Sequence, residues 1–323
     1  MKQESLVEIK NLKKYYLVKN SVHKEKRKYL KAVDNVSLNI QKEEVLGLVG
    51  ESGCGKSTLG HTLLRLNGIT SGSILFDGED ITGYSGKRMR ELREKMQIIF
   101  QDPYASLNPR MTVFDAIAAP LKAFKIGRRE EYYTRVRDAM KVVGLSEQQM
   151  YKYPHEMSGG QRQRVVIARS LIIRPKFIVC DESVSALDVS VRSQVLNLMK
   201  DIKEEYGITY LFISHDLAVI RYLCDRIAVM YLGKIVELAD KEELFCNPLH
   251  PYTKALLSAI PVARVDKNKS ARIILSGDLP SPVNPPLGCG FHTRCTQCAE
   301  QCMSGEVVLR EVAPKHFAAC HFA

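Results

Sequence analysis

Nine consecutive residues of this chain have the types and spacing needed to hold a polyphosphate. The stretch GESGCGKST, residues 50–58, contains a glycine, four further residues and then Gly-Lys-Ser. The apolar run 45–49 before it predicts a buried strand, and apolar residues at helical spacing in 59–66 predict a helix. A glycine-rich turn between a strand and a helix lets backbone N–H groups and the positive helix end surround phosphate groups. The stretch therefore predicts a site for a nucleoside triphosphate.

Two side chains of this loop carry specific chemistry. Lys56 would bring a mobile positive charge to the β- and γ-phosphates, and the Ser57 hydroxyl could ligate Mg²⁺. The alternative is a glycine- and serine-rich turn that matches by chance, against which the flanking strand and helix argue. The residues expected to line the nucleotide are Gly50, Ser52, Gly53, Cys54, Gly55, Lys56, Ser57 and Thr58.

An apolar strand that ends in two acids supplies a second candidate element. The run 177–180 is followed by Asp181 and Glu182. A carboxylate at the carboxyl edge of a sheet would lie beside the phosphate loop, where Asp181 can organise the Mg²⁺ shell and Glu182 can polarise an attacking water. An acid pair can also merely cap a strand, so this element alone leaves both readings open.

A third stretch resembles the signature of a known protein family that also contains the two elements above. The residues MSGGQ, 157–161, are close to the LSGGQ signature of ATP-binding cassette (ABC) ATPases, with Met157 in place of leucine. Gln101 follows one apolar strand, SALD at 185–188 follows the acid pair, and His215 ends the next strand. With all of these elements in one order, the chain is identified as a member of the ABC ATPase family.

The resemblance implies a role for each matching residue. Ser57 and Gln101 would meet Mg²⁺, Asp181 would support that ion, and Glu182 would act as the general base. His215 would contact the γ-phosphate, and Tyr16, rather than the adjacent Tyr15, would lie against adenine. The signature would act in trans, closing on ATP held by a partner subunit. The residues that complete the expected nucleotide set are Ser158, Gly159, Gly160, Gln161 and Asp188.

Further stretches resemble the ATP-binding subunits of dipeptide and oligopeptide importers. They are 102–110, 153–156, 247–253 and a proline-rich run at 277–289 that points to the F-type subunit. The resemblance implies a second ATPase subunit (a D-type homologue, or a homodimer in isolation), two transmembrane permeases and, indirectly, an extracytoplasmic solute-binding protein. It also implies that the segment after Gln101 receives a cytoplasmic helix of a permease.

Five of the nine cysteines lie between residues 289 and 320. In a chain without secretion signals such clustering favours a metal over disulfides. Cys289, Cys295, Cys302 and Cys320 match the spacing of family members whose tail binds a [4Fe–4S] cluster, and four thiolates also suit structural Zn²⁺. Cys298 is an additional thiol. His292, His316 and His321 are interpreted as tail residues rather than ligands.

Composition bounds the remaining possibilities. The chain has 323 residues, 26% of them charged, and a formal net charge of +11, much of it in residues 1–31. No apolar run reaches the length of a membrane span and no signal peptide opens the chain, which predicts a cytosolic protein or one attached peripherally to the cytoplasmic face of a membrane. The cluster 24–28 lacks interleaved aromatics, so a solvated hairpin is favoured there.

Strands that alternate with helices predict an α/β fold with a parallel sheet flanked by helices. In family terms this is a P-loop NTPase with a RecA-like core, an antiparallel β subdomain and a helical subdomain at about 102–160. The predicted domains are an ABC ATPase domain at 1–250 and a cysteine-containing extension at 251–323.

Two further classes of ABC protein and one other cargo stay as alternatives. A soluble ATPase of nucleic-acid repair or translation would fit the positive charge, but the long coiled-coil insertions or paired cassettes of such proteins are absent, so no nucleic-acid partner is expected. A cassette of phosphonate breakdown would lack the cysteine tail. Within transport, nickel or another small solute could replace peptides as the cargo.

Overall fold

The computed structural model describes residues 4–18, 27–260, 273–275, 277–305 and 307–323. Most of the basic cluster 24–28 and the whole polar stretch 266–270 lie outside the described residues. The chain divides into two compact units. The first unit is Gly83–Ile213 with the short segments Met1–Leu6 and Gln41–Glu44, and the second unit holds the remainder.

The first unit contains three parallel strands in the order β6 (Met96–Ile99), β7 (Phe177–Asp181) and β8 (Thr209–Ile213). All residues of β7 and β8 are buried, as expected for strands covered on both faces. The parallel register brings the carboxyl ends of β7 and β8 together, with Asp181 opposite Ile213. β7 covers the predicted strand 177–180 and adds Asp181 to it.

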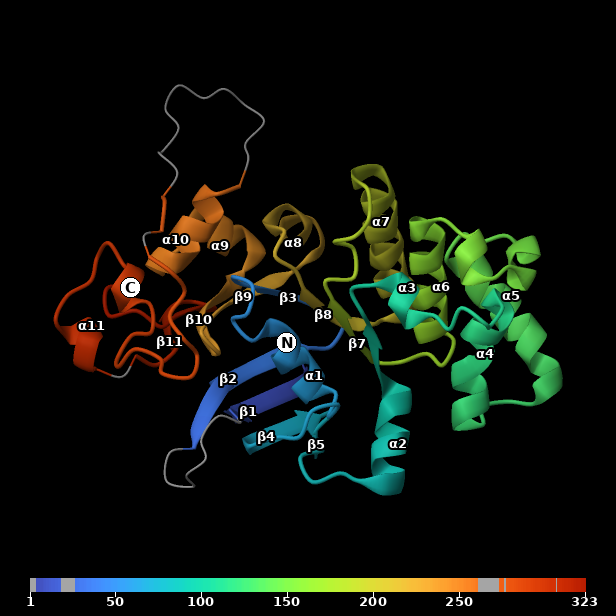
Figure 1. The fold of residues 1–323 in the computed structure, drawn as a ribbon, viewed down its shortest axis with the longest axis horizontal. Helices are drawn as coiled ribbons and strands as arrows, with labels where there is room; N and C mark the ends of the chain where they lie inside the picture. Colours follow the sequence, from blue (N-terminus) through green and yellow to red (C-terminus); the bar gives the residue numbers. More distant parts are fainter. Residues whose placement is uncertain (1–3, 19–26, 261–272, 276, 306) are drawn as a thin grey trace. The chain divides into compact units, whose positions relative to one another are not determined.

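Helices fill the long connection between β6 and β7, as the sequence predicted. They are α3 (Pro103–Ser106), α4 (Val113–Phe124), α5 (Tyr132–Val142) and α6 (Gly159–Leu171), and α4 packs on α5 and α6 (Figure 1). α2 (Gly86–Lys95) precedes β6, and α7 (Val189–Tyr206) connects β7 to β8. Short 3-10 turns lie at Arg129–Glu131, Glu147–Tyr151 and Pro154–Glu156.

The second unit contains an antiparallel sheet in the order β2-β1-β4-β5. Its strands are β1 (Ser5–Val18), β2 (Lys28–Gln41), β4 (Ser71–Phe76) and β5 (Glu79–Asp80). β1 and β2 have 14 residues each, and buried and exposed residues alternate along the second half of β2.

A second set of strands in this unit runs in the order β11-β12-β10-β9-β3. β3 (Val45–Val49) and β9 (Arg226–Tyr231) are parallel, and β10 (Lys234–Asp240) pairs antiparallel with β9. β12 (His316–Ala318) pairs antiparallel with β10, and β11 (Arg310–Ala313) pairs antiparallel with β12. The sequence predicted a parallel sheet, and the antiparallel strands β10, β11 and β12 correct that prediction.

The helices of the second unit are short. α1 (Lys56–Leu63) follows β3, α8 (Leu217–Leu223) precedes β9, and α9 (Lys241–Cys246) and α10 (Pro251–Ser258) follow β10. A 3-10 turn (His292–Arg294) and α11 (Gln301–Ser304) lie in the C-terminal part. No helix in the described ranges is long and apolar enough to cross a membrane.

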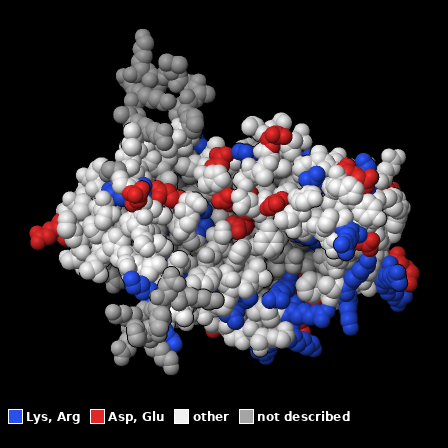
Figure 2. All heavy atoms as spheres, in the orientation of Figure 1, with Lys and Arg blue, Asp and Glu red and all other residues white. Residues whose placement is uncertain are grey.

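Positive charge is not confined to the N-terminal residues. Figure 2 shows Lys and Arg side chains over the part of the first unit that carries α2, α4 and α5. The sequence of α2, GKRMRELREK, alone has five basic and two acidic residues. The net charge therefore has a second source besides the N-terminal arm.

Candidate nucleotide site

The loop at residues 50–55 needs glycine at two close approaches. Gly50 and Gly55 have φ of 153° and 110°, a region that favours glycine. A Cβ at Gly50 would lie 2.2 Å from the carbonyl oxygen of Met230, and one at Gly55 would lie 2.0 Å from that of Ala32. The backbone therefore takes a path that side chains would block. The path ends at α1, whose first turn carries neither an acidic residue nor a side-chain cap.

The Lys56 side chain folds back onto the start of this loop. Its Nζ donates to the carbonyl oxygens of Gly50 and Glu51, at 2.8 and 2.9 Å, and the residue is only 5% exposed. Burial raises the pKa of the adjacent Cys54 thiol, with the Lys56 charge acting in the opposite direction. An amine held against two carbonyls at a helix N-terminus has the charge and position to meet a polyphosphate.

In the first unit, Gln101 and Glu182 are in direct contact. Gln101 Nε2 donates to Glu182 Oε2 at 3.1 Å. The backbone N–H of Glu182 donates to the carbonyl oxygen of Ile213 at 3.0 Å, which fastens the end of β7 to the end of β8. Asp181, the last residue of β7, is 8% exposed. The sequence-predicted glutamine and the two acids therefore lie on neighbouring carboxyl ends of one sheet.

Glu182 adopts a backbone conformation that is uncommon for its residue type. Its φ is 49°, and Ser185 Oγ donates to its carbonyl oxygen at 2.8 Å. A non-glycine residue in this region costs on the order of 1 kcal/mol and persists when its surroundings fix it. The sharp turn directs the Glu182 carboxylate away from the line of β7 and towards Gln101.

The signature residues form the start of α6. Ser158 caps this helix, because its Oγ accepts from the Gln161 N–H at 3.3 Å while its own N–H donates to Gln161 Oε1 at 3.0 Å. Met157 is buried, whereas Ser158 and Gly159 are exposed. A Cβ on Gly160 would lie 2.3 Å from Cγ1 of Val191. Met157 therefore anchors a glycine-rich helix end that is presented outward.

His215 and Asp188 lie next to the ends of strands and helices. His215 is exposed between β8 and α8, where Asp216 caps α8 by accepting from the Ala218 N–H at 2.9 Å. Asp188 is exposed immediately before α7. The phosphate loop and His215 belong to the second unit, whereas Gln101, the acid pair and the signature belong to the first.

The two adjacent tyrosines of β1 have different environments. Tyr15 OH donates to the Asp34 carboxylate, and burial together with Asp34 raises the pKa of its phenol. Tyr16 is exposed, with Lys14 Nζ 4.6 Å from its ring centroid. Tyr15 is thus engaged within the antiparallel sheet, and Tyr16 has the accessible ring.

Two residues outside the predicted site contact the phosphate loop. Tyr252 OH accepts from the Glu51 N–H at 2.7 Å, and Arg294 Nη1 lies 2.9 Å from Glu51 Oε2. Sequence reasoning assigned Glu51 no role, since the loop pattern leaves that position open. The only available signal was Glu51 itself, an acid within a loop that must receive anions.

The C-terminal thiols act on one another electrostatically. Burial raises the pKa of Cys289, and Cys302, Cys295 and Cys320 raise it further. Burial likewise raises the pKa of Cys295, with the other thiols contributing. Backbone N–H groups of Gln297 and Phe322 donate to the sulfur atoms of Cys295 and Cys320, each at 3.4 Å. In the described part of the chain, however, no three His, Cys, Asp or Glu side chains are arranged to hold a metal ion.

Two protein families match separate stretches of the chain. The family described as "ABC transporter" matches residues 33–185, and "Oligopeptide/dipeptide transporter, C-terminal region" matches residues 236–302. The "Oligopeptide transport ATP-binding protein AppF" of Bacillus subtilis (strain 168) is 50% identical over 321 residues, which are 99% of this chain and 98% of that protein.

Solved structures resemble the fold. One is the dimeric post-hydrolysis state of the ATP-binding cassette MJ0796 bound to ADP and Pi, with a TM-score of 0.65 and 29% identity over 73% of this chain and 98% of that chain. Another is cbiO1 from Clostridium perfringens, part of the ABC transporter complex cbiONQ, with a TM-score of 0.66 and 30% identity over 76% and 92%.

These likenesses confirm the predicted fold class, an α/β P-loop NTPase of the ABC ATPase type. More narrowly, the chain belongs to the family of oligopeptide and dipeptide transporter ATP-binding proteins.

Proposed function

We propose that this chain is the ATP-hydrolysing subunit of an importer of dipeptides or oligopeptides. The observation that carries the proposal is its 50% identity to an oligopeptide transport ATP-binding protein over 99% of the chain, C-terminal region included. The full set of ABC motifs supports hydrolysis, because each position that the family uses has a residue able to perform its role. We place the subunit at the cytoplasmic face of a membrane, bound peripherally.

The proposed hydrolysis uses the residues that match the family motifs. The loop backbone and Lys56 hold the ATP phosphates, and Tyr16 lies against adenine. The Glu182 carboxylate takes a proton from water as the water oxygen attacks the γ-phosphorus and the bond to the ADP oxygen breaks. Gln101, in hydrogen-bond contact with Glu182, orients that carboxylate.

The oxygen donors of the proposed site suit Mg²⁺. The Ser57 hydroxyl and the Gln101 amide oxygen are hard ligands of the kind that this ion prefers, and the Asp181 carboxylate would support the bound ion. When bound, Mg²⁺ would neutralise phosphate charge. Asp181 is largely buried at the end of β7, where it can hold an ion in a fixed position.

The site is proposed to be completed by a second ATPase subunit, either a D-type homologue or another copy of this chain. The outward-facing Ser158 and Gly159 at the start of α6 support this, because a hydroxyl and helix N–H groups can then close on ATP held by the partner. Two permeases are the other proposed partners, with the segment after Gln101 receiving a permease helix. A binding protein outside the cell would deliver the peptide.

Reconstitution tests this function. The chain is co-purified with its two permeases and companion ATPase, placed in liposomes and supplied with the binding protein and candidate cargo. Peptides are expected to stimulate ATP hydrolysis. Stimulation by nickel alone would move the assignment to the nickel importers, and lack of response to either cargo would refute the proposed substrate class.

We also propose that Cys289, Cys295, Cys302 and Cys320 hold a [4Fe–4S] cluster, with Zn²⁺ as the alternative. Their mutual electrostatic influence and the N–H donors to two of the sulfurs support the donor set, since such donors are usual around cluster thiolates. The four thiols would have to lose their protons to bind a metal, and a bound metal would favour that loss. At Cys289 and Cys295, burial opposes it by raising the pKa of the thiol.

A further inference from the structure

Glu51, the second residue of the phosphate loop, is held through all three of its polar groups. Its N–H donates to Tyr252 OH at 2.7 Å, and its carbonyl oxygen accepts from Lys56 Nζ at 2.9 Å. Its carboxylate oxygens accept from Arg294 Nη1 at 3.1 and 2.9 Å. Of the three residues that bind Glu51, two, Tyr252 and Arg294, lie beyond residue 250 and so far outside the loop motif.

The Arg294–Glu51 pair is shielded from water. The Arg294 side chain is 9% exposed and that of Glu51 is 26% exposed. Ion pairs on the open surface contribute little, but pairs withdrawn from solvent interact more strongly, and losing one partner leaves a costly unpaired charge. Without Arg294, the Glu51 negative charge would remain in a loop whose backbone must accept a polyanion.

The groups that hold Glu51 are themselves fixed by packing. Tyr252 is fully buried, with ring centroids 4.7 Å from Tyr231 and 5.4 Å from Phe291. Phe291, three residues before Arg294, also meets Tyr231 edge to face at 5.2 Å. This aromatic cluster joins α10 and the C-terminal extension to β9, and so it fixes the distance between the extension and the loop.

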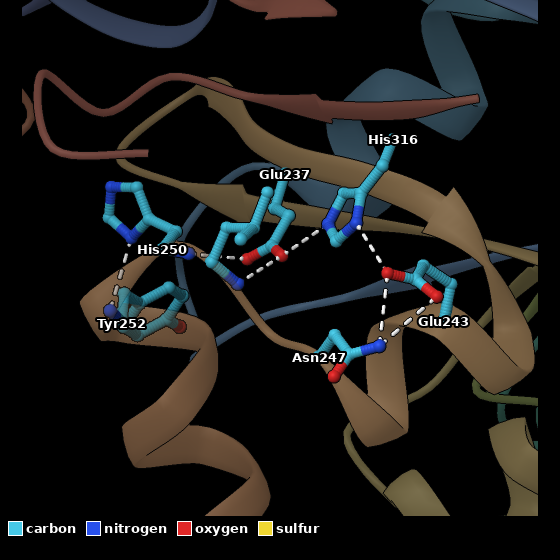
Figure 3. Close-up of polar contacts among 7 residues, drawn as sticks. Glu237, Glu243, Asn247, His250, Tyr252 and His316 are labelled. Atoms are coloured by element: carbon cyan, nitrogen blue, oxygen red, sulfur yellow. Dashed lines mark hydrogen bonds and ion pairs between the residues drawn. The ribbon is translucent and has the colours of Figure 1, made fainter. Parts of the chain in front are cut away.

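A buried carboxylate holds the residues that immediately precede α10. Glu237, wholly buried on β10, accepts from the N–H groups of Leu249 and His250 at 2.7 and 2.9 Å, and it contacts His316 Nε2 of β12 at 2.8 Å (Figure 3). His250 Nδ1 then accepts from the Tyr252 N–H at 3.1 Å. The tyrosine that meets the phosphate loop is thereby set in position.

We propose that Arg294 is a positioning residue for the phosphate loop: it neutralises Glu51 and so allows the loop to bind the triphosphate. Tyr252 fixes the same residue through its backbone. The C-terminal extension is thus a structural part of the nucleotide site. This inference rests on the proposed ATP site and names residues that the loop motif does not contain.

The test measures MgATP affinity and steady-state hydrolysis on the full chain. Arg294→Gln is expected to weaken MgATP binding and raise KM about tenfold, with kcat nearly unchanged, since the loss concerns phosphate binding rather than proton transfer. Because repulsion grows with ligand charge, the loss is expected to be larger for ATP than for ADP. Added salt should reduce this loss of affinity, because it screens the repulsion between Glu51 and the phosphates.

The decisive variant is the double substitution Glu51→Gln with Arg294→Gln. It removes both charges, so MgATP affinity should return to within about threefold of the wild type. A purely structural role of Arg294 would not be rescued in this way. Glu51→Gln alone also keeps the inference open to test if Arg294→Gln fails to fold, because it should bind MgATP at least as well as the wild type.

The matched control is Arg310→Gln. Arg310 also lies in the extension, where its Nη2 donates to the carbonyl oxygens of Cys320 and Ala323 at 3.3 and 2.9 Å, away from the loop. It should leave MgATP affinity unaltered. Wild-type affinity in Arg294→Gln, or no rescue in the double variant, would overturn this inference alone, whereas a wild-type chain unable to bind MgATP would overturn the proposed function itself.

Discussion

Gln101 and Glu182 meet at 3.1 Å although 81 residues separate them in the chain. The contact follows from the parallel pairing of β6 with β7, which brings the carboxyl ends of both strands to one edge. An amide that donates to a carboxylate leaves the amide oxygen available for a metal ion. A single hydrogen bond thus relates the proposed Mg²⁺ ligand to the proposed base.

Replacing the proposed base should stop chemistry without preventing binding. Glu182→Gln is expected to lower kcat by ~10²–10⁴ while MgATP still binds, because only proton removal from water is lost. The variant should accumulate as an ATP-bound dimer in size-exclusion chromatography. Glu204→Gln, an exposed glutamate on α7, serves as the control. Hydrolysis at the wild-type rate by Glu182→Gln would remove Glu182 from the mechanism.

The signature should act on the partner's nucleotide. Ser158→Ala removes the helix cap and the hydroxyl, and it is expected to reduce hydrolysis at least tenfold while monomer affinity for MgATP stays unaltered. The measurement compares nucleotide titration at low protein concentration with ATPase rates at high concentration. Equal losses in both would indicate that Ser158 acts within its own subunit instead.

Stability should fall in mild acid because of His250. Burial, aided by the Lys254 charge, lowers the pKa of His250 to about 4 from an ordinary 6.5. The folded state therefore favours the neutral ring, so its contribution is complete above pH 6.5 and declines as the pH falls towards 4. At pH 5 the loss is about 2 kcal/mol in the free energy of unfolding.

Urea unfolding between pH 7.5 and 5 checks this expectation. His250→Asn keeps an acceptor for the Tyr252 N–H but does not titrate, so its unfolding free energy should depend less steeply on pH than that of the wild type. Parallel pH profiles for the two proteins would contradict the assignment to His250.

The tail cysteines can be tested by metal content. After anaerobic purification the wild-type chain is expected to carry iron and acid-labile sulfide, and Cys302→Ser should lose both, because a thiolate ligand is missing. Cys298→Ser, outside the proposed set, is the control and should retain them. Zinc without sulfide would select the alternative metal, and retention of the metal by Cys302→Ser would exclude this ligand set.

Local pattern sufficed for the phosphate loop, the acid pair and the helical connection, because each is encoded by contiguous residues. It failed for β10, whose centre is the charged residue Glu237. That carboxylate is buried because backbone N–H groups and His316 satisfy it, and these partners lie 12 to 79 residues away. The hydrogen bond between Tyr15 and Asp34 likewise joins two different strands, and the sequence did not predict it. Contacts of this kind have no signature in a single sequence.

Glu51 and Arg294 lie in different matched families, at 33–185 and 236–302. Because the two families match separate stretches, the ATPase region and the C-terminal region could be treated as modules that can be exchanged independently. The ion pair predicts otherwise: a chimera that joins this ATPase region to a foreign C-terminal region should hydrolyse ATP well only if an arginine again reaches Glu51. Deleting the extension should weaken ATP binding, and Glu51→Gln should recover part of it. In that case, the ATPase region and its C-terminal region could be transferred to another protein only together.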